Sequence, residues 1–258
     1  MNGWPMATLV FPYIGSKTMS LHMHPEQMPS AIMPVVPPDM PPVPDGRIPA
    51  GTTVIQALSG FDVVIVPGLD GSGPQHWQSQ WELFFRMHGV TVRRVQQDNW
   101  THPHYPDWVQ GLQHAVQTCH RPVILVAHSL GAILGVRMAI EQGAAGIVGA
   151  FLVAPADIDH HHGPEATRVA GFAPLPATPL PFPAVLMASQ DDEWLRMPRA
   201  RDLAARWGAT LIDAGAVGHI GNHARVGLWP DGMTALENLV RLIRQRALHS
   251  GTGTPRLS

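Results

Sequence analysis

The sequence predicts an α/β fold in which about six mostly parallel strands carry helices on both faces. The first observation is alternation: from about residue 59 to residue 250, short β-branched runs alternate with amphipathic segments. This order is typical of strands joined by crossover helices in a parallel sheet. The second is that the runs are apolar at nearly every position, as in strands buried on both faces. With no internal repeat, 59–250 is expected to form one domain.

Each run and each amphipathic segment is assigned to one element, in chain order. The expected strands are 61–68, 90–95, 122–128, 146–154, 183–189 and 209–215. The expected helices are 74–88, 105–118, 130–142, 197–207 and 231–247. The last of these, with the pattern "ALENLVRLIRQRAL", repeats apolar residues at helical spacing and is expected to pack on the core. The carboxyl ends of such strands are where the functional residues of an open parallel sheet gather.

The first 58 residues have a different composition from the rest of the chain. Residues 1–58 hold 11 of the 26 prolines and 7 of the 12 methionines. Proline fixes φ and removes a backbone donor, so this segment is expected to be a disordered, partly polyproline tail without helix or central strand. A proline-rich tail can bind a protein partner, and that role stays open. Residues 251–258 are expected to form a short flexible tail.

Composition and charge argue against several kinds of partner. The formal net charge is -2, and only 14% of the residues are charged, so neither nucleic acid nor a membrane surface is an expected partner. No apolar run is long enough to span a bilayer, and the N-terminus lacks the pattern of a secretory signal. The lone cysteine, Cys119, cannot form an internal disulfide. Together these observations favour a cytoplasmic location.

A strand-to-helix turn follows the third expected strand. The residues Ala127-His128-Ser129-Leu130-Gly131 match the G-x-S-x-G pattern with alanine in the first place. Small residues are needed at both ends because the nucleophile elbow is a sharp turn that holds its serine in a strained conformation. An ordinary junction with Ser129 as a helix N-cap is the alternative. The catalytic interpretation needs a base and an acid elsewhere in the chain.

Those partners are found after later strands, in the order that this architecture requires. "ASQDDEW" (188–194) follows the fifth strand and "AGAVGHIGN" (214–222) follows the sixth. A serine hydroxyl needs a base, and the base needs an acid that orients it. Asp191 is favoured over Asp192 as the acid because it comes first where the loop leaves the sheet. His219 is favoured over His223 as the base because it follows Gly218 in a short loop.

The loop after the first strand, "PGLDGSGPQHWQSQWE" (67–82), is expected to complete an oxyanion hole. Its glycines allow the backbone to approach a ligand closely. A backbone amide near Leu69 or Asp70 would point at the substrate oxygen together with the amide of Leu130. The loop has no phosphate-binding spacing, and no cofactor is expected. The histidines of "DHHH" (159–162) lack a supporting carboxylate cage, so no metal is expected either.

With these residues assigned, the chain resembles the retinoblastoma-binding protein 9 / YdeN-like serine hydrolases of the α/β-hydrolase superfamily. The matching segments, spread over nearly all of 61–245, are "VPGLDGSGPQHWQSQWE", "QQDNWTHPHYPDWVQGLQHAV", "VAHSLG", "VAPADID", "SQDDEW" and "GHIGN". The resemblance implies a compact α/β-hydrolase fold with Ser129 as nucleophile, Asp191 as acid and His219 as base. "DNW" followed by a proline and a tryptophan (98–108) is a hallmark of the group by resemblance.

The expected function is that of a serine hydrolase acting on a small acyl substrate. Residues 154–182, where many members of the superfamily insert a cap, are only 29 residues and rich in proline, so no large cap domain is expected. A small ester, thioester or amide would be cleaved through an acyl-enzyme. The alternative is a non-catalytic or weakly catalytic protein-interaction module on the same fold.

Overall fold

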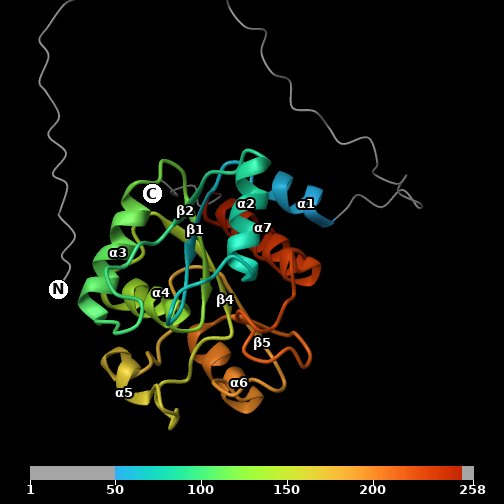
Figure 1. The fold of residues 1–258 in the computed structure, drawn as a ribbon. Coiled ribbons are helices and arrows are strands. Elements are labelled where there is room, and N and C mark those ends of the chain that lie inside the picture. Colours follow the sequence, from blue (N-terminus) through green and yellow to red (C-terminus); the bar gives the residue numbers. More distant parts are fainter. Residues whose placement is uncertain (1–49, 252–258) are drawn as a thin grey trace, which may run out of the picture. The chain divides into compact units, whose positions relative to one another are not determined.

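Six strands form a single parallel sheet in a computed structural model that describes residues 50–251 (Figure 1). The strand order is β2-β1-β3-β4-β5-β6, and every neighbouring pair is parallel. The strands are β1 (Asp62–Val66), β2 (Val92–Arg94), β3 (Val123–His128), β4 (Ile147–Val153), β5 (Ala184–Ala188) and β6 (Thr210–Asp213). The predicted fold class is confirmed, and each expected strand is present at its place in the chain.

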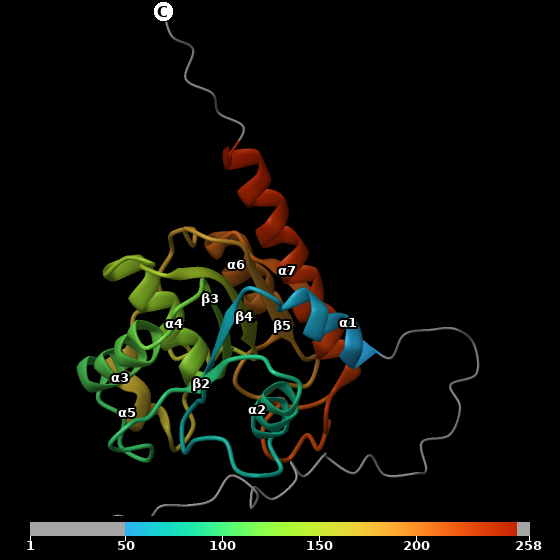
Figure 2. The ribbon, with the colours of Figure 1, turned by 90° about the horizontal axis from the view of Figure 1, so that it is seen from above.

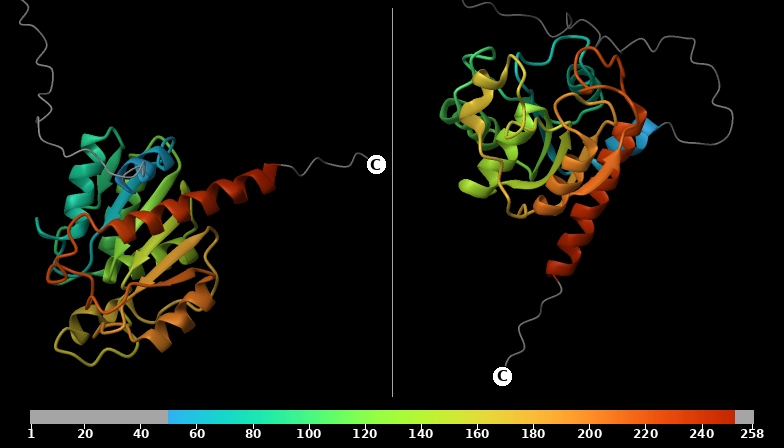
Figure 3. Two further views of the ribbon diagram at one scale, coloured as in Figure 1. Left: turned by 90° about the vertical axis from the view of Figure 1, so that its right-hand side faces the viewer. Right: turned by 90° about the horizontal axis from the view of Figure 1, so that it is seen from below.

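Helices cover both faces of this sheet (Figures 2 and 3). One face packs against α1 (Ala50–Ala57), α2 (Trp77–Met87) and α7 (Pro230–Gly251). The other packs against α3 (Tyr105–Gln117), α4 (Leu130–Glu141) and α6 (Met197–Trp207). Each face encloses its own apolar cluster, which is why β1, β3 and β5 are buried at every residue. Their nearly unbroken apolar sequences are the direct consequence.

The segment after β4 carries only short helices. Between Val153 and Ala184 the chain forms α5 (Ala166–Val169) and one turn of 3-10 helix, Ala170–Phe172, and otherwise runs as loop. Val169 and Phe172 are buried against the α3/α4 side of the core. As expected, this cap segment (154–182) is no separate domain.

The folded part begins earlier than the sequence predicts. Helix α1 lies inside the expected tail, and its Val54, together with Leu58, is fully buried against the α7 side of the sheet. The Arg244 guanidinium of α7 donates to the carbonyls of Ala57 and Ser59, at 2.8 and 3.0 Å. The chain after Pro49 has no further proline until Pro67, and its apolar residues at helical spacing were outweighed by the composition of the preceding residues. The remainder of the expected tails, 1–49 and 252–258, lies outside the described residues.

The sheet places several loops at one edge. Because all strands run parallel, the loops after β1, β3, β5 and β6 leave the same carboxyl edge. Between residues 50 and 251, no helix is long and apolar enough to cross a membrane.

Candidate active site

The elbow between β3 and α4 holds Ser129 in a strained backbone conformation. Ser129 has φ 54° and ψ −125°, a backbone region that residues other than glycine rarely adopt. Gly131 makes the turn feasible, because a Cβ there would lie 2.2 Å from the carbonyl oxygen of Pro67 and 2.5 Å from that of Val66. A Cβ on Gly68 would lie 2.8 Å from that of Ser129. The elbow therefore packs directly against the end of β1.

A continuous line of hydrogen bonds joins three side chains from three different loops. The Ser129 hydroxyl lies 2.7 Å from His219 Nε2. His219 Nδ1 lies 2.8 Å from Asp192 Oδ1 and 3.1 Å from Asp192 Oδ2. With Nδ1–H donating to the carboxylate, Nε2 is left as the acceptor for the serine proton. The arrangement has the geometry of a hydroxyl nucleophile, a base and an orienting acid.

The expected pairing of Asp191 with His219 is wrong: the carboxylate beside the imidazole belongs to Asp192. The Asp192 side chain is completely buried and also accepts from the backbone amide of Trp194 at 2.8 Å. Asp191 is exposed and makes other hydrogen bonds: its Oδ1 accepts from Ser189 Oγ (2.8 Å) and from the amide of Gly218 (2.7 Å). These hydrogen bonds lower the pKa of Asp191, with the Gly218 amide the largest cause. The carboxylate that pairs with His219 thus lies one residue later in the loop than the sequence suggested.

Asp191 and His128 hold the backbone that carries His219. Asp191 ties the loop after β5 to Gly218, one residue before His219. From the elbow, His128 Nε2 donates to the carbonyl of His219 at 2.9 Å. Burial is the largest cause that lowers the pKa of His128, so its ring stays neutral with the proton on Nε2. The His219 loop is thus anchored on two sides, by the acid loop and by the residue before Ser129.

A second buried histidine packs behind His128. The ring centroids of His76 and His128 are 4.8 Å apart in an edge-to-face contact. His76 Nδ1 accepts from the amide of Gln78 and so caps helix α2. Burial, followed by the charges of Arg94 and His219, lowers the pKa of His76 from 6.5 to about 3. Both rings therefore remain neutral next to His219 and add no competing positive charge.

Gln78 fastens the loop after β1 to the ends of two strands. Its buried side-chain amide donates to the carbonyls of Val66 and Val126, the residues near the carboxyl ends of β1 and β3, at 3.1 and 3.0 Å. Its Oε1 accepts from Ser72 Oγ at 2.6 Å. The loop that approaches Ser129 is therefore bound to the same strands as the elbow.

The three backbone amides that the sequence suggests for an oxyanion hole differ in their hydrogen bonding. Within the described part of the chain, the amides of Leu69 and Leu130 have no hydrogen-bond partner. The amide of Asp70, the other candidate, is not free, because it donates to the carbonyl of Trp100 at 3.0 Å. Asp70 instead forms an ion pair with Arg168 of the cap segment, at 2.5 Å. Of the two expected loop positions, only Leu69 keeps a free amide.

Ser129 and His219 line a cavity of about 740 Å³. Among the described residues, its lining contains no lysine or arginine but four carboxylate residues, Asp70, Glu165, Asp191 and Glu193. His223, the alternative base, also lines the cavity, but its ring makes no hydrogen bond to Ser129. A cavity of this size suits a small organic substrate.

Two histidines of the "DHHH" segment (159–162) contact neighbouring side chains. Among residues 50–251, no group of three or more histidine, cysteine, aspartate or glutamate side chains is arranged to hold a metal ion. In the "DHHH" segment, His160 Nδ1 lies 3.0 Å from Asp157, and the His161 ring stacks on Trp194. Trp77 and Trp81 are buried in the core.

Comparison with known proteins gives the family. The sequence model described as serine hydrolase matches residues 63–238, well over half of the chain. The chain belongs to the serine hydrolase family. Among solved structures, a YdeN-like hydrolase of Pectobacterium atrosepticum is 30% identical, with a TM-score of 0.65, over 75% of this chain and 98% of that one. No curated protein sequence matches the chain.

More distant structures share the fold. The ydeN gene product of B. subtilis is 21% identical over 70% of this chain and 99% of its own, with a TM-score of 0.56. Mouse alpha/beta hydrolase domain-containing protein 10 is 15% identical over 74% of this chain and 91% of its own, also with a TM-score of 0.56. At these identities the likenesses show the shared fold alone.

The sequence does not predict the roles of three residues that shape the site, His76, Gln78 and His128. Gln78 and His76 lie in a segment that was assigned to the oxyanion loop and its helix, but no role was given to either side chain. The only signal was two polar residues, His76 and Gln78, flanking the first of the two core tryptophans at the start of an otherwise amphipathic helix. His128 stood inside the elbow motif, where any residue is allowed, so the motif carried no information about it.

Proposed function

We propose that this hydrolase cleaves a small ester, thioester or amide through an acyl-enzyme on Ser129, with His219 as the base and Asp192 as the acid. The observation that carries the proposal is the unbroken hydrogen-bonded line from Asp192 through His219 to Ser129. Its members come from three loops at one edge of the sheet, and the three are bonded in the order that acyl transfer needs.

The steps follow from the positions of the protons. Ser129 Oγ attacks the carbonyl carbon while its proton passes to His219 Nε2. The amides of Leu69 and Leu130 would stabilise the developing oxyanion, and Asp192 the imidazolium. His219 then gives its proton to the leaving oxygen, sulfur or nitrogen. A water molecule, deprotonated by the same imidazole, attacks the acyl-enzyme and restores Ser129.

The experiment is covalent labelling by a fluorophosphonate probe, followed by mass spectrometry of the adduct. We expect labelling of Ser129 in the wild-type protein, none in Ser129→Ala, and strongly slowed labelling in His219→Ala and Asp192→Asn. The fluorophosphonate reports an activated hydroxyl without any assumption about the natural substrate. A folded wild-type protein that takes up no probe would refute the proposal and favour the interaction-module alternative. If Ser129 is labelled, panels of esters, thioesters and amides decide the substrate class.

A further inference from the structure

A second cavity lies beside the first. It measures about 730 Å³, within the range of small-molecule sites, and shares Glu165, Glu193 and Trp194 with the cavity at Ser129. Its remaining wall comes from the cap segment on one side and from the start of α6 on the other. These wall residues are Asp157, His160, His161, His162, Gly163, Pro164, Arg196, Pro198 and Arg199.

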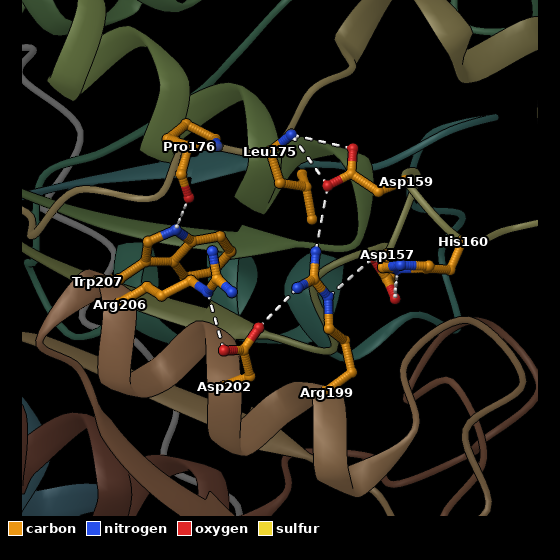
Figure 4. Close-up of polar contacts among 9 residues, drawn as sticks. All are labelled: Asp157, Asp159, His160, Leu175, Pro176, Arg199, Asp202, Arg206 and Trp207. Atoms are coloured by element: carbon orange, nitrogen blue, oxygen red, sulfur yellow. Dashed lines mark hydrogen bonds and ion pairs between the residues drawn. The ribbon is translucent and has the colours of Figure 1, made fainter.

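The walls of this second cavity are fixed by a polar network (Figure 4). The Arg199 guanidinium of α6 donates to Asp157, Asp159 and Asp202, at 3.2, 3.1 and 2.6 Å. Asp159 in turn accepts from the amide of Leu175, farther along the cap segment, at 3.1 Å. Arg199 thus joins the cap segment to α6. Because a guanidinium is planar and bonds several carboxylates in a fixed geometry, it holds the two walls of the cavity in a defined position.

Six of the twelve residues that line the second cavity carry a ring: His160, His161, His162, Pro164, Trp194 and Pro198. The His161 ring stacks on Trp194 with centroids 3.6 Å apart and planes inclined by 8°. Trp194 also lies 5.7 Å from the ring of His219 and so stands between the second cavity and the hydrogen-bonded line of the site. The faces of Pro164 and Pro198 complete this ring-rich lining.

The charges in the second cavity are largely paired. Arg199 contacts three carboxylates, and one of them, Asp202, also binds Arg206. Asp157 lies 3.0 Å from His160, and Glu165 lies 3.5 Å from His161. Glu193 and Arg196 are exposed and opposite in sign. Three carboxylates and two arginines stand in this lining, so the formal charges nearly cancel. Such a lining, half of it rings, favours an uncharged flat group, since aromatic rings gain from stacking beyond their buried area.

We propose that the second cavity binds an uncharged aromatic group of the substrate, joined to the scissile carbonyl by a linker that passes Trp194. This inference rests on the proposed function, because the carbonyl is taken to lie at Ser129. The substrate class is then an ester, thioester or amide that carries a flat ring several bonds from the cleaved bond, on the acyl or the leaving side.

Turnover of matched esters tests the inference. On the acyl side, 5-phenylpentanoate, 5-cyclohexylpentanoate and acetate esters of one fluorogenic alcohol are compared. On the leaving side, 5-phenylpentyl and 5-cyclohexylpentyl acetates are compared. We expect kcat/KM to favour the phenyl over the cyclohexyl compound by about five- to tenfold in one of the two series. A ratio near one in both series would overturn the inference.

A plugging variant assigns the preference to this cavity. His162→Trp places a large side chain in the second cavity without altering Ser129, His219 or Asp192. We expect the phenyl preference to fall to about one, with turnover of the acetate ester within about twofold of wild type. His114→Trp, the same change at an exposed position on α3, is the control and should keep the preference. A preference that survives in His162→Trp would overturn the assignment.

Binding to an inactive variant separates this inference from the proposed function. In Ser129→Ala, the phenyl amide that matches the preferred series, 5-phenylpentanamide for the acyl side or N-(5-phenylpentyl)acetamide for the leaving side, should bind more tightly than its cyclohexyl counterpart. The added His162→Trp substitution should abolish the difference. If the fluorophosphonate labels Ser129 but no ring preference is found, the second cavity is no subsite and the proposed function stands. If the amide binds as expected but Ser129 is not labelled, the subsite stands and the proposed chemistry fails.

Discussion

The elbow (127–131) and the acid loop (189–194) serve one site, but the sequence specifies them in different ways. In the elbow, backbone contacts leave no room for error: Gly131 packs against the carbonyls of Val66 and Pro67, closer than any Cβ could. In the acid loop two adjacent aspartates satisfy the same sequence pattern, and only the path of the chain decides between them. A motif that requires small residues can therefore be recognised from the local sequence. The choice between two adjacent aspartates depends on which side chain points at His219, and the local sequence does not show that.

The largest effect that this comparison predicts is for Asp192→Asn. The amide cannot hold His219 in the tautomer that leaves Nε2 as an acceptor, so kcat should fall by about 10³- to 10⁴-fold. Steady-state turnover of an acetate ester measures it. A loss that appears in Asp191→Asn instead would contradict the geometry of the acid loop.

The elbow should break at Gly131 with the next largest effect. In Gly131→Ala the new Cβ meets backbone oxygens, which cannot move aside cheaply, so the first turn of α4 and the amide of Leu130 must shift. We expect kcat/KM to fall by about 10²-fold or more, because a displacement near 1 Å has that cost. Unfolding in urea should show a loss of about 1–3 kcal/mol.

Gly135→Ala, one turn later in the same helix, is the matched control. There the Cβ would lie 3.2 Å from Leu125 Cδ1, the end of a side chain that can adjust. Activity close to wild type is therefore expected. Equal losses in the two variants would mean that the elbow is not the sterically determined part of the site.

The fold was largely predictable because its signals are local. The apolar runs that became β1, β3 and β5 are buried at every residue, and the helices between them keep their apolar faces on the sheet. The boundary at residue 58 failed because a composition measured over many residues hid a short helix, α1. Its Val54 is recognisable as a core residue only once α7, almost two hundred residues later, is in place.

The site divides along the same line. Ser129 and His219 could be proposed from the order of loops along the chain, since that order follows from the topology of the sheet. The pairing of Asp192 with His219 and of the Asp70 amide with the Trp100 carbonyl depends on hydrogen bonds between distant segments. The carbonyl that accepts from the Asp70 amide belongs to Trp100, in the loop after β2. The sequence of the loop after β1 contains no sign of this contact.

His128 joins the elbow to the loop that carries His219, and we expect an intermediate effect when it is replaced. It belongs to the elbow, yet its Nε2–H holds the carbonyl of His219. In His128→Phe the shape is nearly kept but the donor is lost, and kcat should fall by about ten- to a hundredfold through displacement of the base. His128→Gln, which can still donate, should recover part of the loss. A KM that rises with unchanged kcat would indicate a contact with substrate instead.

The smallest effect is expected for Asp191→Asn. Asp191 is exposed and acts on His219 only through the amide of Gly218, so kcat should fall by less than about tenfold. Its pKa is lowered in the folded protein, so the carboxylate and its two hydrogen bonds are present above the ordinary value of 3.8 and are lost only at lower pH. The ratio of wild-type to variant turnover should therefore stay constant from about pH 5 to pH 9. A ratio that changed across the range in which histidine titrates would show that Asp191 acts on the protonation of His219, as the sequence alone had suggested.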